Sequence, residues 1–135
     1  DEGSGAWLGR SLLARALRAV DGFVPQTALL AEVIADHRDP AGIVSVARDA
    51  RPADFAALAP RVLGSSDPAA VAILDQAVAD VAAAIAHLQG DNPVPVVFLG
   101  GLAPVFARAL AGRWDMRAPL GTALDGALIL AREAA

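Results

Sequence analysis

A short apolar segment, Val94–Leu99, restricts the folds open to this chain more than any other part of the sequence. It is rich in β-branched residues and lacks polar alternation, which predicts a strand buried on both faces. Gly100 and Gly101 follow it directly. A buried strand needs neighbours for its backbone hydrogen bonds, and the sequence offers one further candidate, Trp114–Ala118. We therefore expect the rest of the sheet to lie in sequence that is absent here.

Helices are predicted for most of the remaining sequence, because apolar side chains recur with a period near 3.6 between capping residues and prolines. Trp7 falls on the apolar stripe of the first helix and is expected in the core. Pro60 is expected to end or kink the helix before it. These elements predict a helix-rich α/β fold, with about six helices around one or two strands. The predicted helices are Ser4–Val20 with Ser4 as the cap, Thr27–His37, a short one at Ala41–Ala47, Ala53–Ala59, Pro68–Gln89, Pro104–Ala111 and Leu120–Arg132.

The length of 135 residues predicts a single domain, residues 1–135, or part of a larger one. Its 56% of apolar and 19% of charged residues exclude a disordered segment. The net charge of −4 gives no basic footprint, so we expect no nucleic-acid partner. The arginines are spread along the helices rather than clustered as in a phosphate clamp. Neither a signal peptide nor a long uninterrupted apolar run is recognisable, so no membrane partner is expected.

Residue types typical of many catalytic and metal sites are scarce. The chain has no cysteine, which excludes a disulfide, a thiolate metal site and a cysteine nucleophile. His37 and His87 lie far apart and lack a second ligand at helical spacing, so no metal site is predicted. A Walker-type phosphate loop and a nucleophile elbow are both missing from the sequence.

Three glycine-containing or acidic segments remain as candidates for binding. Gly100-Gly101 after the predicted strand would let a backbone approach a flat or anionic ligand, or would simply permit a tight turn. Asp1 and Glu2 precede a helix, where carboxylates could bind sugar hydroxyls, act as a base, or only favour the helix start. Gly121 and Gly126 are unfavourable inside a helix, which indicates close approach by another element or by a ligand.

These segments, in this order, resemble the C-terminal half of the N-acetylglucosamine/glucosamine kinase-like family. That family belongs with the BadF/BadG-type ATPases in the superfamily of actin, hexokinase and the heat-shock ATPases. The resemblance covers nearly the whole chain, and the order and spacing of the segments carry it. The matching segments are Asp1–Arg10, Phe55–Pro60, Leu99–Pro104 and Leu124–Ala131.

The resemblance implies a fold, a reaction and a set of ligands. The chain would be part of a C-terminal ribonuclease-H-like lobe of a two-lobed kinase, which transfers phosphate from ATP, with Mg²⁺, to the 6-hydroxyl of N-acetylglucosamine or glucosamine. Gly100, Gly101 and Leu102 would line the adenosine site. Asp1 would bind sugar hydroxyls, with Glu2 in support. A cytoplasmic location and a homodimer of the complete protein also follow from the resemblance.

The family's phosphate loops and catalytic base precede Asp1 in the family's order, so no catalytic residue is assigned here. We therefore expect the isolated chain to lack kinase activity, because phosphoryl transfer needs a metal and a base as well as positioning. Two other functions stay open. One is a BadF/BadG-type ATPase that activates a dehydratase or reductase, although such relatives carry cluster-binding cysteines. The other is a non-catalytic helical remnant.

Overall fold

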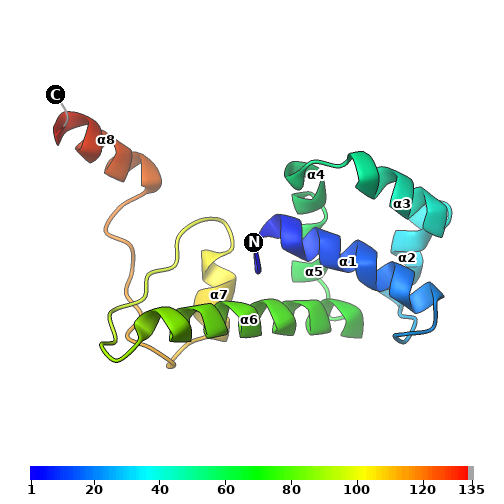
Figure 1. Ribbon diagram of the computed structural model, residues 1–135, viewed down its shortest axis with the longest axis horizontal. Helices are drawn as coiled ribbons and strands as arrows, with labels where there is room; N and C mark the ends of the chain where they lie inside the picture. The colour runs from blue at the N-terminus through cyan, green and yellow to red at the C-terminus, as the bar shows by residue number, and fades with distance from the viewer. Residues whose placement is uncertain (134–135) are drawn as a thin grey trace. The chain divides into compact units, whose positions relative to one another are not determined.

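A computed structural model describes residues 1–133 of the chain, which contain eight helices (Figure 1). The chain divides into two compact units, Asp1–Ile85 and Ala86–Ala135. The prediction of one lobe over residues 1–135 stays a prediction. The helices are α1 (Gly5–Val20), α2 (Ala28–Asp36), α3 (Pro40–Asp49), α4 (Pro52–Ala56), α5 (Ala59–Leu63), α6 (Pro68–Gln89), α7 (Ala103–Ala109) and α8 (Ala123–Glu133).

Helix α1 is the centre of the first unit. The Ser4 hydroxyl caps it by accepting a hydrogen bond from the Trp7 amide at 3.0 Å, as its position in the sequence predicted. Leu8 and Leu12 lie one turn apart and are completely buried. Helices α2, α3, α4 and α5 all pack against α1. The amphipathic stripe of one helix thus supplies much of the core of this unit.

Gly9 allows α1 and α4 to approach each other closely. A Cβ atom at this position would overlap the carbonyl oxygen of Phe55, which belongs to α4. The Arg10 guanidinium lies 5.4 Å from the centre of the Phe55 ring, which adds a cation–π contact at the same junction. A glycine in the middle of a helix is unfavourable on its own, so the close packing explains its presence.

The segment that was predicted as one helix at Ala53–Ala59 contains most of α4 and the first residue of α5. Pro52 lies in the first turn of α4, which ends at Ala56, and Pro60 lies in the first turn of α5. Proline is well accommodated there because the amide it lacks would have no partner inside the helix. Pro60 therefore separates two helices, and α5 is an element that the sequence analysis did not predict.

Asp67 connects α2 to the start of α6. Its Oδ2 accepts a hydrogen bond from the Leu29 amide at 3.0 Å, and its Oδ1 accepts one from the Ala69 amide at 2.8 Å. Burial raises the pKa of this carboxyl, but hydrogen bonds from Leu29, Ala69, Thr27 and Ala70 outweigh that cost and hold the pKa below its ordinary value of 3.8.

Asp67→Ala is expected to lower the free energy of unfolding at pH 7 by about 1–2 kcal/mol, the range for a lost helix cap. Because the folded pKa is depressed, the stabilisation is present above pH 3.8 and is lost as the pH falls through the folded pKa. Urea unfolding at pH 7 and pH 3 checks this. Asp75→Ala, at an exposed position of α6, is the control and is expected to change little. Equal losses for the two variants at pH 7 would contradict the cap.

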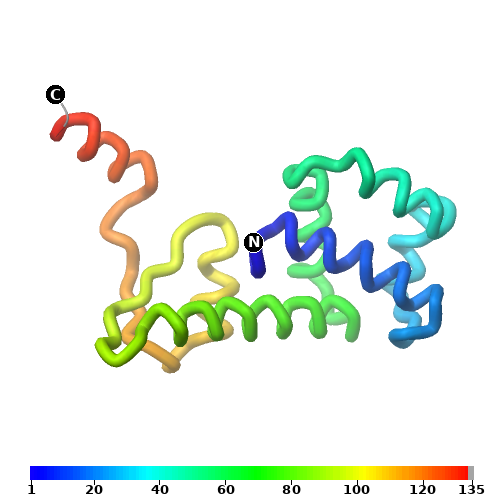
Figure 2. The backbone as a smooth tube through the Cα atoms, viewed as in Figure 1, coloured from blue at the N-terminus to red at the C-terminus, as the bar shows by residue number. Residues whose placement is uncertain are grey.

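The second unit contains the two segments that were predicted as strands. A single parallel bridge joins Val96 to Met116, and residues 1–133 form no strand of regular length. The Val96 amide donates to the Asp115 carbonyl at 2.8 Å, and the Arg117 amide donates to the Val96 carbonyl at 3.0 Å. The extended course of both segments is visible in Figure 2. The two predicted partners therefore meet, although only at one position.

Burial of Val94–Leu99 on both faces was predicted and is wrong for this structure. Val94, Val97 and Leu99 are 61%, 43% and 66% exposed. The prediction assumed a sheet with neighbours on each side, and the described residues supply one short partner. The missing neighbours also explain why the pairing does not extend beyond one bridge.

Helix α8 has no buried residue within the described part of the chain. Leu124, Leu128 and Leu130 are all at least half exposed. A Cβ atom at Gly126 would meet nothing within 4 Å, so the close approach expected at this glycine is not present here. The atoms nearest to a Cβ at Gly121 would be those of the Asp125 side chain, whose carboxylate accepts hydrogen bonds at the start of α8.

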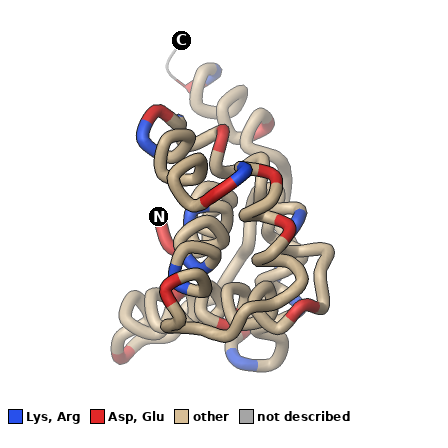
Figure 3. Tube along the Cα trace, turned by 90° about the vertical axis from the view of Figure 1, so that its right-hand side faces the viewer, with Lys and Arg blue, Asp and Glu red and all other residues tan. Residues whose placement is uncertain are grey.

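By length and composition alone, α6 could cross a membrane, since its most apolar window has a mean hydropathy of 1.7. Core helices of soluble proteins pass the same test, so this is weak evidence. Ala69, Ala70 and Ile73 on α6 are buried within the protein. In Figure 3, acidic and basic residues are interspersed along the trace.

Candidate functional site

The first candidate binding site is a pocket of about 880 Å³ within the second unit. Four parts of the chain form it: the segment 96–100, one side of α7, the turn at residues 111–112, and the segment 116–123 that leads into α8. Its volume lies within the roughly 300–1,000 Å³ that small-molecule sites occupy. The lining residues are Val96, Phe98, Leu99, Gly100, Ala103, Pro104, Ala107, Ala111, Gly112, Met116, Arg117, Ala118, Pro119, Gly121, Thr122 and Ala123.

Gly100 forms the turn from the extended segment into α7. Its φ is +92°, a conformation that side-chain-bearing residues rarely adopt, and a Cβ atom there would meet open space. Its carbonyl accepts a hydrogen bond from the Ala103 amide at 3.2 Å, which closes the turn. The tight-turn interpretation and the ligand-approach interpretation of Gly100 are therefore compatible, since the same residue turns the chain and lines the pocket.

Gly101 and Leu102, the other two residues predicted to bind adenosine, do not line the pocket. A Cβ atom at Gly101 would meet nothing within 4 Å. Leu102 precedes α7, and its carbonyl accepts hydrogen bonds from the Val105 and Phe106 amides at 3.0 and 3.2 Å. Leu102 thus forms the start of α7, while Gly100 is the one of the three that lines the pocket.

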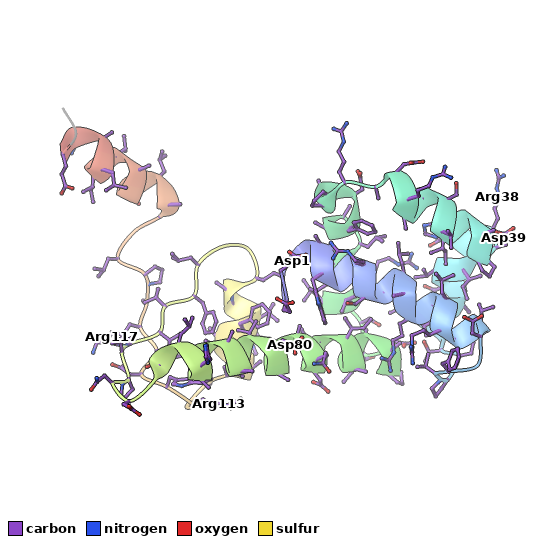
Figure 4. The ribbon with its side chains drawn as sticks, viewed as in Figure 1. Asp1, Arg38, Asp39, Asp80, Arg113 and Arg117 are labelled. Atoms are coloured by element: carbon purple, nitrogen blue, oxygen red, sulfur yellow. The ribbon has the colours of Figure 1, made fainter. Side chains whose placement is uncertain are left out.

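The pocket is mostly apolar, with few polar groups at its edge. The Phe98 and Phe106 rings stack with centres 6.2 Å apart, which fixes Phe98 in the wall. Arg117 also lines the pocket, and its Nη2 donates a hydrogen bond to Asp115 Oδ2 at 2.8 Å. Arg117 is labelled in Figure 4, on the segment that follows α7. A flat apolar group with hydrogen-bonding edges, such as a nucleobase, suits such walls.

Thr122 and Asp125 order the entrance to α8 beside the pocket. Asp125 Oδ2 accepts hydrogen bonds from the Thr122 amide at 2.6 Å and from its hydroxyl at 2.7 Å. These two bonds hold the pKa of the Asp125 carboxyl below its ordinary value. The carboxylate therefore stays ionised and keeps Gly121 and Thr122 in place along the rim.

Asp1 and Glu2 lie at the start of the first unit, and both are exposed. Asp1 Oδ1 accepts from the Ser4 hydroxyl at 2.7 Å, and its Oδ2 lies 3.4 Å from Nη2 of Arg10. The Asp1 carboxylate is thus oriented by a serine and an arginine, and Figure 4 labels it ahead of α1.

The structure brings together two segments that the sequence analysis considered separately, since Gly100 and Gly121 line one pocket. It also adds Phe98, Met116 and Thr122 to the site. Met116 lies in Trp114–Ala118, the second predicted strand, and Thr122 lies next to Gly121 in the glycine-containing segment noted in the sequence, but neither residue was itself predicted to bind a ligand. Within residues 1–133, no group of three or more His, Asp or Glu side chains could hold a metal ion.

Two known proteins resemble this chain over nearly its whole length, although no family model matches it. The glucosamine kinase GspK of Vibrio cholerae is 30% identical over 97% of the chain. A crystal structure from Chromobacterium violaceum, of a protein provisionally described as an N-acetylglucosamine kinase, is 36% identical over 96% of the chain, with a TM-score of 0.81.

In both comparisons the chain spans 47% of the other protein, about half its length. Identities of 30–36%, together with a high structural similarity, exceed what a shared fold alone requires. The helix-rich fold accordingly matches part of a kinase structure with an actin-like fold. The homologues of this chain are thus a glucosamine kinase and a protein described as an N-acetylglucosamine kinase, and the chain is similar to about half of each, which is consistent with a C-terminal fragment of that family.

Proposed function

We propose that this chain forms part of an ATP-dependent, cytoplasmic amino-sugar kinase that phosphorylates glucosamine or N-acetylglucosamine at the 6-hydroxyl. In that enzyme the pocket around Gly100 binds the adenosine of ATP, and the Asp1 carboxylate accepts hydrogen bonds from the sugar. Two findings together support the proposal. The homologues are amino-sugar kinases, and an apolar pocket of about 880 Å³ lies at the Gly100 turn.

The walls of the pocket support the adenosine assignment. The pocket's side chains are largely apolar, and the turn at Gly100 presents bare backbone to it. A flat base can lie against a backbone without a Cβ atom, and the ribose hydroxyls can meet the polar rim at Thr122. Burial of the base contributes affinity in proportion to the apolar area that it removes from water.

The rest of the reaction depends on groups beyond those described. In phosphoryl transfer the sugar hydroxyl attacks the γ-phosphate, while a base takes its proton and Mg²⁺ offsets the charge. Mg²⁺ prefers carboxylate and phosphate oxygens, and no carboxylate lines the pocket in the part of the chain described. These residues therefore do not fit a magnesium site, and we assign them only positioning of the nucleotide and of the sugar.

Binding of ADP to the purified 135-residue chain tests the adenosine assignment. A ligand that binds only the folded state stabilises it by about 2.7 kcal/mol at a hundred times its Kd. We expect ADP to raise the melting temperature in a saturable manner. Adenosine alone should also raise it, because the proposed contacts are to the base and ribose. No shift with either ligand would favour the non-catalytic remnant.

An activity assay tests whether the isolated chain can catalyse phosphoryl transfer. The isolated chain should release no sugar-dependent ADP, since it supplies no base or phosphate loop.

In the complete kinase that contains this sequence, Asp1→Asn is expected to raise KM for the sugar about tenfold or more, because hydrogen bonds to a charged group contribute about 1.5–3 kcal/mol. Steady-state kinetics with glucosamine and N-acetylglucosamine check this. Asp75→Asn, at an exposed position of α6, is the control, and an unchanged KM for Asp1→Asn would exclude the sugar contact.

A further inference from the structure

A second, smaller pocket of about 250 Å³ lies within the first unit, between α1 and α6. Figure 1 shows these two helices, blue and green. The pocket's residues on α1 recur every three or four positions, so they share one face of that helix. Its volume is below the roughly 300–1,000 Å³ of drug-sized ligands. The lining residues are Trp7, Ser11, Ala14, Arg15, Arg18, Ala72, Ile73 and Gln76.

Two arginines give this pocket a local positive charge in a protein whose net charge is −4. Arg15 and Arg18 are three residues apart on α1, and no acidic residue lines the pocket. Among residues 1–133, neither guanidinium lies within 4.0 Å of a carboxylate oxygen in an ion pair. The sequence analysis considered the arginines too widely spread for a phosphate clamp, but helical spacing brings these two to one face.

The neighbours of the arginines restrict their positions. The Arg18 guanidinium lies 5.3 Å from the centre of the Phe23 ring, which restrains its side chain. Arg15 is half-buried, so part of its hydration is already lost. Both features lower the cost of binding an anion, because the arginine side chains have less conformational entropy and less hydration left to lose.

The polar and aromatic groups complete the pocket. The Gln76 Nε2 donates a hydrogen bond to Asp80 Oδ1 at 2.8 Å, and Asp80 lies one turn further along α6 (Figure 4). The Asp80 carboxylate is therefore paired with this amide. The Ser11 hydroxyl is a further donor in the lining. Trp7, which was expected in the core, is only half-buried and lines this pocket instead. Its ring offers a flat apolar wall beside the two cations.

We propose that this pocket binds a small phosphate-bearing anion. Two guanidinium groups match the geometry of phosphate oxygens through paired hydrogen bonds, and a hydroxyl can supply another donor. The volume admits a phosphate group with few additional atoms. This site shares no residue with the Gly100 pocket, so the inference does not depend on the proposed nucleotide site.

Titration of the 135-residue chain with inorganic phosphate and with phenyl phosphate, at constant ionic strength, tests the proposal. The chain has two tryptophans, so a Trp114→Phe background leaves Trp7 as the fluorescent reporter inside the pocket. We expect a saturable change in Trp7 emission. Tighter binding of phenyl phosphate would identify a phosphate ester as the preferred ligand, and equal binding would identify free phosphate.

Arg15→Gln and Arg18→Gln are each expected to weaken binding about tenfold or more. Arg48→Gln is the matched control, because it removes the same charge from α3 in the same unit, at an exposed site paired with Asp49. Circular dichroism verifies that each variant is folded. A linear, unsaturable response, or an equal loss in Arg48→Gln, would overturn the proposal. ADP binding that persists in both pocket variants would show that the nucleotide uses another site.

Discussion

The Gly9→Ala variant is expected to lose about 3 kcal/mol of its free energy of unfolding, the upper end of the usual cost of overpacking. The added methyl group would occupy the position of the Phe55 carbonyl oxygen. Backbone cannot move aside as a flexible side chain can, so α1 and α4 would have to separate. That separation would expose part of the core around Leu8 and Leu12.

Gly5→Ala is the matched control on the same helix. A Cβ atom at Gly5 would lie 3.4 Å from Cβ of Ala56, an ordinary contact distance. This variant is expected to be neutral or slightly more stable, since alanine favours helix by up to about 1 kcal/mol over glycine. Urea unfolding monitored by circular dichroism distinguishes the two. Equal midpoints for Gly5→Ala and Gly9→Ala would show that α1 and α4 do not pack as described.

The Gly100→Val variant is expected to lose ADP binding by at least about tenfold. Gly100 has a φ of +92° and lines the pocket of about 880 Å³. A valine there strains the turn and adds two methyl groups beside the proposed position of the adenosine. Isothermal titration with ADP and with adenosine measures the loss, which should be similar for both ligands because the clash concerns the nucleoside.

Gly90→Val separates backbone strain from loss of the site. Gly90 also has a positive φ, of +53°, and a Cβ atom there meets nothing within 4 Å. It belongs to the same unit but does not line the pocket. We expect Gly90→Val to lose stability without losing affinity for ADP. If both variants bind ADP as the parent chain does, the adenosine site is not at Gly100.

Local chemistry explains which parts of the fold could be predicted from the sequence. The bounds predicted for Pro68–Gln89 agree with α6, and Ser4 caps α1 as expected. Caps and prolines act within a few residues of their own position, so no knowledge of the tertiary structure is needed. Asp39 illustrates the limit: its carboxylate accepts a hydrogen bond from the Gly42 amide at 2.7 Å and caps α3, which begins at Pro40, earlier than the predicted Ala41.

The site was less predictable because it depends on contacts between segments. Gly100 and Gly121 each drew attention as glycines, but their common pocket depends on the pairing of Val96 with Met116. The close packing anticipated at Gly126 was instead found at Gly9. A sequence shows where a side chain is missing, whereas only the fold shows which neighbour occupies the space.

The lone bridge between Val96 and Met116 also affects how the protein should be handled. On either side of that bridge, extended backbone is left without a regular ladder, and exposed edges of this kind can template the addition of strands from other molecules. Pro93 and Pro95 have no amide hydrogen and interrupt such growth next to Val94. Val97 and Leu99, beyond the prolines, are exposed and carry no such protection. Concentrated preparations should therefore lose material to slow β-type aggregation, and Val97→Lys should slow that loss by adding a charge to the open edge.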